Sequence, residues 1–204
     1  MSDARRPYHH GHLRQAVIDS AVAEVEAVGA SALSMRAVAR RAGVSHAAPA
    51  HHFGDKAGIF TAVAIEGFEL MTEAIAPVAF ADGGFVAGGA GYVEFALGHP
   101  GHFEVMFRPA LYHREDPRLV EASERAFEVL FESARHAVEL QGLDDDPEGL
   151  AIAGWSLAHG LATLWLQSNL VDRLGSDPLG QLARGAVAMG EVTRRALGGG
   201  GQSP

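Results

Sequence analysis

Apolar and polar positions between Ser34 and Phe53 follow helical spacing, interrupted once by a glycine. One set of apolar residues recurs at the i, i+3, i+4 and i+7 positions that form one buried face of a helix: Met35, Val38, Ala39 and Ala42. Ser34 precedes this set, and its hydroxyl predicts a helix N-cap. Gly43 can end the helix because glycine adopts a positive φ without a Cβ penalty, and Ser45 predicts the cap of the next helix. The pattern predicts two short helices joined by a tight turn.

Two such helices are typical of a helix-turn-helix, in which the second helix enters the major groove of DNA and its first residues meet base edges. The expected second helix runs from Ser45 to His52, and Phe53 anchors its end. Pro49 falls at the end of its first turn, where proline forfeits about one backbone hydrogen bond. A helical hairpin inside a protein core has the same pattern, so this segment alone leaves both interpretations open.

Helical spacing recurs along the rest of the chain, whereas β-branched runs and period-two alternation are scarce. The sequence therefore predicts an all-α protein of about nine helices, with a three-helix N-terminal helix-turn-helix domain and a larger C-terminal domain. Beyond the motif, helices are expected at about 12–28, 55–76, 85–97, 117–142, 148–172 and 177–197, with an aromatic-rich helix beyond Pro100 that contains Phe103, Met106 and Phe107. The expected divisions are a flexible arm at 1–10, the DNA-binding domain at 11–56, the larger domain at 57–197 and a disordered tail at 198–204.

The helix expected at 85–97 lies in a glycine-rich stretch. A glycine inside a helix costs about 1 kcal/mol relative to alanine, so this helix should be weakly held. Neither a GxGxxG nor a GxxxxGK motif occurs there, which argues against a phosphate-binding loop. We expect this helix to be a compliant wall of a cavity.

Charge is distributed unevenly. Residues 1–56 hold seven Lys or Arg against five Asp or Glu, although the 204-residue chain carries a net charge of −9. A basic N-terminal segment in an otherwise acidic chain is consistent with nucleic-acid binding. The chain has no cysteine, and its first residues are polar and basic, so the sequence predicts no disulfide and no secretory signal, as in a cytoplasmic protein.

The segment 149–171 contains no charged side chain and is long enough to cross a bilayer. Polar residues interrupt it, and its flanks are not basic. A helix that is apolar all round also results when one side packs on its own subunit and the other on a partner. We favour burial in a dimer over a membrane span.

Histidines offer the alternative of a metal site, because imidazole binds zinc, copper and nickel. The pairs and clusters are His9, His10 and His12, then His51 with His52, and His99 with His102. The first group lies in or next to the N-terminal arm, the second in the expected recognition helix and the third at an apparent helix junction, so none of them requires a metal. Neither HExxH nor the paired ExxH motifs of di-iron bundles occur. We therefore expect no metal, no cofactor and no catalytic residue. A helical metal-binding or small-molecule-binding protein or enzyme without DNA binding is the alternative.

The segment ALSMRAVARRAGVSHAAPAHHFGDKAGIF resembles the N-terminal DNA-binding domain of the tetracycline-repressor-like (TetR) family of transcriptional regulators. The resemblance implies DNA-backbone contacts from Ser34, Arg36 and Lys56. It also places the recognition helix at Ser45, His46, Ala47, Ala48, Pro49, Ala50, His51 and His52. Within that helix, the residues expected to contact bases are His46, Ala47, Ala48 and His51.

Two positions depart from the family pattern. Ala50 stands where a tyrosine usually packs on the DNA backbone, and Gly58 stands where a glutamate usually completes a capping box with Asp55. The first change predicts one phosphate contact fewer. The second predicts a weaker start for the helix at 55–76, by a fraction of about 1 kcal/mol.

A second resemblance covers the C-terminal half. AGWSLAHGLATLWL, with Trp155, His159 and Gly160, resembles the C-terminal domain of a TetR subgroup named for its Trp-His-Gly motif. The resemblance implies that the last two long helices form a four-helix bundle with the same pair of a second subunit, through Leu157, Leu161, Leu164 and Val187. It also implies a small apolar effector, for which the candidate pocket residues are Phe68, Tyr92, Phe95, Phe103, Met106, Phe107, Trp155, His159 and Trp165. Plain core packing is the alternative for each of these side chains.

Together these features predict a ligand-responsive regulator in the cytoplasm that has no enzymatic activity. The expected partners are a near-palindromic double-stranded DNA operator, a second copy of the chain and a small-molecule effector, without a membrane. By the family's common mode, the protein represses transcription and is released from DNA by the effector.

Overall fold

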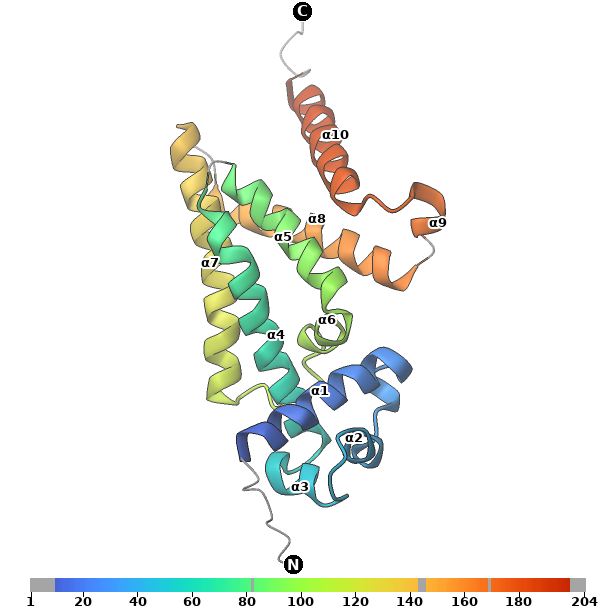
Figure 1. The fold of residues 1–204 in the computed structure, drawn as a ribbon. Helices are drawn as coiled ribbons and strands as arrows, with labels where there is room; N and C mark the ends of the chain where they lie inside the picture. The colour runs from blue at the N-terminus through green and yellow to red at the C-terminus, as the bar shows by residue number, and fades with distance from the viewer. Residues whose placement is uncertain (1–9, 82, 143–145, 169, 199–204) are drawn as a thin grey trace, which may run out of the picture. The chain divides into compact units, whose positions relative to one another are not determined.

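The computed structural model describes residues 10–81, 83–142, 146–168 and 170–198, which form helices joined by short turns. The predicted all-α class is confirmed, and no strand occurs among these residues. The predicted arm and tail fall almost entirely outside them. The helices are α1 (His10–Val28), η1 (Ala30–Ala32), α2 (Met35–Arg41), α3 (Ala48–Phe53), α4 (Lys56–Ala79), α5 (Gly84–Gly98), α6 (Pro100–Met106), α7 (Pro117–Gln141), α8 (Pro147–Gln167), α9 (Leu170–Leu174) and α10 (Pro178–Gly198) (Figure 1).

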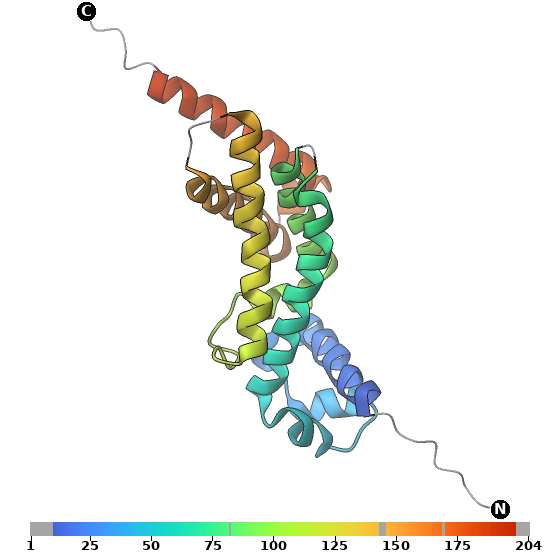
Figure 2. The ribbon, with the colours of Figure 1, turned by 90° about the vertical axis from the view of Figure 1, so that its left-hand side faces the viewer.

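The chain separates into two compact units. The first comprises the chain up to Thr72 together with Gly98–Phe127, and the second comprises Glu73–Leu97 and the chain from Glu128 onward. Helices α4 and α7 contribute residues to both units (Figures 1 and 2). Helix α6 and the first part of α7 therefore belong to the same unit as the helix-turn-helix segment.

The first unit has a core built around α1. Helix α1 packs against α2 and against α6, so the N-terminal segment and a segment some eighty residues later share one core. The largest fully buried side chains of this unit are apolar and come from α1, α2, α3, α4 and α6: Val17, Ile18, Val25, Val38, Pro49, Ile59, Phe60, Val63, Val105 and Met106.

The turn between α2 and α3 has the predicted construction. Ser34 is the N-cap of α2, and its Oγ accepts a hydrogen bond from the backbone N–H of Ala37 at 3.1 Å. Gly43 adopts a φ of +67°, and the N–H of Val44 donates to the carbonyl of Ala39 at 3.0 Å. The glycine is required here because a side chain is strained at a positive φ.

The start of α3 differs from the prediction. The helix begins at Ala48 instead of Ser45, its N-cap is Ala47, and no side chain caps it. Ser45 and His46 lie in the preceding turn, where the N–H of Ala48 donates to the carbonyl of Ser45. The physical reason is Pro49, which occupies the first turn of α3, where a missing N–H costs no helical bond and the fixed φ favours a helix start.

Helix α4 also differs at both ends from the prediction. It continues through Pro77 to Ala79, and Ala79 is buried. At its start, Asp55 still accepts a hydrogen bond from the N–H of Gly58 at 2.8 Å. A Cβ at position 58 would lie 1.9 Å from the carbonyl oxygen of Phe53. Gly58 therefore allows the start of α4 to lie close to the backbone of Phe53. A glutamate at this position would clash with that backbone before it could complete a capping box with Asp55.

The second unit contains α5, α8, α9, α10 and the distal parts of α4 and α7. The glycine-rich segment forms the predicted helix, and α8 packs against both α9 and α10. Helix α8 ends at Gln167, before the expected 172, and the short α9 follows. Among the described residues, α8 is the one helix that is long and apolar enough to cross a membrane, and 22% of its apolar window is buried within the chain.

Candidate functional site

The exposed face of α2 carries unpaired positive charge. Arg36 and Arg40 are exposed, and neither forms an ion pair within the described part of the chain. Arg41 differs, because its guanidinium lies 3.2 Å from the carboxylate of Glu24 on α1. Two guanidinium groups therefore remain available for an anion on this face.

The turn before α3 and the outer side of α3 expose the predicted base-contacting residues. His46 and Ala47 are exposed in the turn, and Ala50 and His51 are exposed on the helix. The exposed surface here is built from small side chains and imidazole groups, which can contact thymine methyl groups and base-edge hydrogen-bonding atoms.

Not every residue assigned to the recognition helix faces outward. Ser45 is exposed, whereas Ala48 and His52 are half-buried, and the ring of His52 lies edge-on to that of His51 at 5.1 Å. Pro49 is fully buried, which corrects its expected role as a DNA contact. Its side chain packs into the unit and fixes the start of α3.

Two further residues predicted to contact DNA phosphates have suitable donors. The Oγ of Ser34 already accepts from Ala37, so its own proton can be donated to a phosphate oxygen. The Nζ of Lys56 donates to the carbonyl of Ser31 at 3.1 Å and lies 5.4 Å from the centre of the Phe60 ring. An ammonium group has three donors, so Lys56 can hold this position and still bind an anion.

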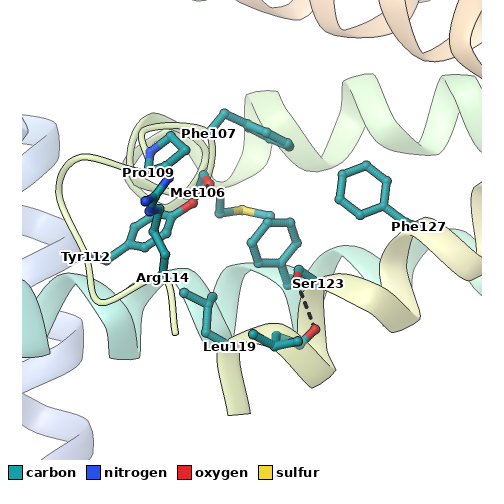
Figure 3. Close-up of a pocket in the computed structure, with 10 residues that line it drawn as sticks. Met106, Phe107, Pro109, Tyr112, Arg114, Leu119, Ser123 and Phe127 are labelled. Carbon is teal, nitrogen blue, oxygen red and sulfur yellow. Dashed lines mark hydrogen bonds between the residues drawn. The ribbon is translucent and has the colours of Figure 1, made fainter. Parts of the chain in front are cut away.

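An apolar cavity of about 300 Å³ lies in the first unit, between α4, α6, the loop after α6 and α7 (Figure 3). Three of the predicted ligand-binding residues line it: Phe68, Met106 and Phe107. The sequence did not identify the other lining residues, which are Pro109, Tyr112, Arg114, Leu119, Val120, Ser123 and Phe127. Leu119, Val120 and Phe127 belong to an apolar helical pattern, whereas the loop residues carry no periodic signal.

Aromatic rings fix one wall of this cavity. The ring of Phe107 lies 6.0 Å from that of Phe68 and 5.4 Å from that of Phe103, both in edge-to-face geometry. Such pairs stabilise by about 0.5–1.5 kcal/mol beyond the area they bury. Phe103 is itself buried and contacts the wall through Phe107.

The loop after α6 is held by its own hydrogen bonds. The hydroxyl of Tyr112 donates to the carbonyl of Met106 at 2.8 Å, and the backbone N–H of His113 donates to the Oγ1 of Thr61 at 3.0 Å. Burial raises the pKa of Tyr112, and the positive charge of Arg114 opposes that rise. The hydroxyl is therefore protonated at neutral pH.

Three other predicted ligand-binding residues meet in the second unit. The hydroxyl of Tyr92 lies 2.7 Å from Nδ1 of His159, and the indole N–H of Trp155 donates to the same hydroxyl at 3.4 Å. Burial raises the pKa of Tyr92 and lowers the pKa of His159. Since the indole can only donate, the Tyr92 hydroxyl accepts from Trp155, and its own proton can be donated to Nδ1 of a neutral His159 whose proton is on Nε2.

The last two predicted ligand residues also lie in the second unit. Phe95 is buried on α5 and Trp165 is half-buried on α8. The nine predicted residues are thus divided between the apolar cavity of one unit and the hydrogen-bonded cluster and core of the other.

A polar cluster that the sequence did not identify joins α1, α4 and α6. His102 is buried, and its Nε2 lies 3.6 Å from Oε1 of Glu66, which also accepts from the amide of Gln15. His102 lowers the pKa of Glu66, and Gln15 adds to this effect against the opposing effect of burial. The rings of His99 and His102 lie 5.9 Å apart, but in the described residues no three potential ligands are placed to hold a metal ion.

The predicted dimerisation residues differ in exposure. Leu164 of α8 is 54% exposed and Val187 of α10 is 73% exposed, whereas Leu157 and Leu161 are half-buried. Further exposed apolar side chains on the same two helices are Ile152, Leu166, Met189 and Val192. The chain by itself leaves these apolar residues uncovered.

Comparison with protein families finds two matches. Residues 17–63 match the model of bacterial regulatory proteins of the tetR family, and residues 85–189 match the model of the tetracyclin repressor-like C-terminal domain. The second match alone spans about half of the chain. No curated protein matches the sequence.

Solved structures with the same fold are found in several bacteria. A protein of unknown function from Rhodococcus sp. RHA1 is 29% identical, with a TM-score of 0.71 over 91% of this chain and 96% of that chain. A regulatory protein of the tetR family from Rhodococcus RHA1 is 20% identical, with a TM-score of 0.68 over 84% and 92%. A tetR-family transcriptional regulator from Pectobacterium atrosepticum is 21% identical, with a TM-score of 0.61 over 92% and 96%.

Proposed function

The chain belongs to the bacterial tetR family of regulatory proteins, and on this basis we propose that it binds operator DNA as a homodimer and represses transcription until a small effector releases it. The observation that carries the proposal is that Arg36 and Arg40 of α2 are exposed without an ion pair in the described part of the chain, and that α2 packs against α3, where His51 and the preceding His46 are also exposed.

The proposed docking follows from this face. The turn and first residues of α3 enter the major groove, where His46, Ala47 and His51 contact base edges. Ser34, Arg36 and Lys56 bind flanking phosphates, which positions the protein without specifying sequence. The small side chains on α3 predict that thymine methyl contacts and DNA shape contribute to specificity.

The proposed dimer is formed by α8 and α10. Their exposed apolar residues, including Leu164 and Val187, form a surface that a monomer would leave in contact with water. In a symmetric dimer, the same surface of the second subunit would cover this one. The two helix-turn-helix domains could then bind a near-palindromic site whose half-sites lie about 34–36 Å apart or at a multiple of that distance. Burial in a dimer also accounts for the apolar character of α8 in a cytoplasmic protein.

The proposed effector binds the cavity lined by Phe68, Met106 and Phe107. A ligand shifts the equilibrium between DNA-bound and free states only if it binds one state more tightly. The loop that lines one side of this cavity is hydrogen-bonded to α4 through Thr61, and α4 begins at Lys56. Binding in the cavity can therefore bias the helix that carries a proposed phosphate contact.

Selection from a random pool of DNA duplexes tests this function. The proposal predicts enrichment of sequences with two inverted half-sites, and the position of conserved bases should match one major groove for each subunit. If purified protein whose first unit is folded enriches no sequence over the starting pool, the proposal is contradicted.

A further inference from the structure

The cavity of the first unit has one charged lining residue. Nine of the ten lining side chains are uncharged, and the exception is Arg114, which lies beside Tyr112 and Pro109, away from the Phe127 end of the cavity (Figure 3). The lining contains no acidic side chain. Glu115, the next residue in the chain, is exposed and does not contribute to the lining.

Arg114 has no carboxylate partner in the described part of the chain, unlike the arginines that precede and follow it in the sequence. Arg108 pairs with Glu104 at 3.0 Å, and Arg118 pairs with Asp116 at 2.9 Å. Arg114 is exposed to solvent. The guanidinium at the rim of this cavity is therefore available to a ligand.

The other polar groups of the lining offer no free donor. The hydroxyl of Ser123 donates to the carbonyl of Val120 at 2.9 Å, and the hydroxyl of Tyr112 donates to the carbonyl of Met106 at 2.8 Å. Both hydroxyl protons are thus used inside the protein. A ligand in this cavity meets apolar walls and one strong donor, which is Arg114.

We propose that the effector is a small carboxylic acid with a compact apolar body, held by apolar contacts in this cavity and by Arg114 at its rim. This ligand class rests on the proposed function, since it treats the cavity as the effector site. A guanidinium presents paired donors that match a carboxylate. A volume of about 300 Å³ lies at the small end of ligand pockets and suits a compact molecule.

Matched probes test the ligand class. Octanoate and 2-naphthoate are each compared with the neutral alcohol of the same carbon skeleton, 1-octanol and 2-naphthalenemethanol, by isothermal titration calorimetry on the full chain at neutral pH. The proposal predicts that at least one carboxylate binds about tenfold or more tightly than its alcohol. Equal binding of both carboxylates and their alcohols, or no binding of either carboxylate, would overturn it.

Variants assign the preference to Arg114. Arg114→Gln should remove the preference for the carboxylate and leave binding of the alcohol unchanged, and Arg114→Lys should restore part of it. Arg125→Gln is the control, because it removes the same charge from an exposed residue that faces Glu69 at 3.9 Å and does not line the cavity. A carboxylate preference that survives Arg114→Gln, or that Arg125→Gln removes equally, would contradict the assignment.

These measurements use no DNA, so they are separable from the proposed regulation. A chain that selects an operator but prefers neither carboxylate refutes the ligand class and leaves the regulator intact. A chain that binds a carboxylate through Arg114 but enriches no DNA sequence refutes the regulator and leaves the ligand class intact.

Discussion

The ring of His113 lies 3.2 Å from Oδ1 of Asp55, the same oxygen that accepts a hydrogen bond from the N–H of Gly58 at the start of α4. The hydrogen bond from Gly58 lowers the pKa of Asp55 most, burial opposes this, and the hydrogen bond with His113 lowers it further. The adjacent backbone N–H of His113 is bonded to Thr61 one turn further along α4. The loop that carries Arg114 is thus attached to α4 at two points, close to Lys56.

The two attachments should differ in strength. Thr61 is buried, so Thr61→Val leaves the N–H of His113 without its acceptor and should lower the free energy of unfolding by about 1–3 kcal/mol. It should also speed amide hydrogen exchange across residues 107–116, as measured by mass spectrometry. His113→Ala is the control, because it removes only an exposed ion pair worth about 0–1 kcal/mol and keeps the backbone bond. Equal effects of the two substitutions would contradict this account of the loop.

Two glycines inside helices should respond in opposite directions to alanine. Helix propensity alone favours alanine by about 1 kcal/mol at either position. At Gly58, however, the new Cβ would lie 1.9 Å from the carbonyl oxygen of Phe53, so Gly58→Ala should destabilise the protein. At Gly89 of α5 the new Cβ would meet no atom within 4 Å beyond its chain neighbours and its own helix backbone, so Gly89→Ala should stabilise the protein by about 0.5–1 kcal/mol. Urea unfolding measures both, and a stabilising Gly58→Ala would show that the close approach is not required.

The pair formed by Tyr92 and His159 predicts a pH dependence of stability. Burial lowers the pKa of His159, so in the folded state the ring stays neutral below the pH at which the unfolded chain, with a pKa near its ordinary value of 6.5, takes up a proton. Proton uptake by the unfolded state lowers the free energy of unfolding as pH falls through about 6.5. This loss should be smaller in His159→Gln, whose amide can still accept the Tyr92 hydroxyl.

Urea unfolding of both proteins between about pH 8 and pH 5 measures this difference. The wild-type free energy of unfolding, minus that of the variant, should decline as pH falls. Asp55, Glu66 and Asp116, whose pKa values are lowered, lose their contributions only at more acidic pH and do so in both proteins. A difference that stays constant across this range would contradict a neutral, buried His159.

The oligomeric state tests the surface formed by α8 and α10. Val187→Glu should place a charge in the proposed interface and shift the protein from dimer to monomer in analytical ultracentrifugation. Val86→Glu on α5 is the matched control, because Val86 is 69% exposed and Val187 is 73% exposed, but no dimer contact is proposed for it. A wild-type monomer, or a dimer that survives Val187→Glu, would count against the proposed interface.

Local patterns in the sequence predicted those features that depend on local chemistry. Ser34 caps α2 and Gly43 ends it because an N-cap hydroxyl and a positive φ are requirements of neighbouring backbone atoms. The start of α3 was misplaced because a serine N-cap and a proline in the first turn are both good start signals, and Pro49 fixes the start instead of Ser45. Pro77 likewise predicted that the helix ends before it, whereas α4 continues through Pro77 to Ala79.

The hydrogen-bonded cluster around Tyr92 and the ligand cavity were both harder to predict, because the residues of each come from distant segments. Trp155 and His159 are one turn apart and could be paired by spacing, but Tyr92, which bonds to both, lies more than sixty residues earlier. Arg114 lies in a loop without periodicity, and only the fold places it at the rim of the cavity beside α7. A sequence pattern specifies which face of a helix is apolar, but not which loop side chain closes a cavity.

The central claim is that the face carrying Arg36 and the start of α4 binds DNA. Fluorescence anisotropy measures the affinity for the selected duplex as a function of salt, for the wild type and for Arg36→Ala/Lys56→Ala. The account predicts weaker binding by the double variant on every duplex and a salt slope shallower by about 0.9 for each lost phosphate contact. Arg135→Ala/Arg173→Ala, which removes the same charge from the second unit, should leave the slope unchanged. An unchanged affinity and slope in Arg36→Ala/Lys56→Ala would contradict the account.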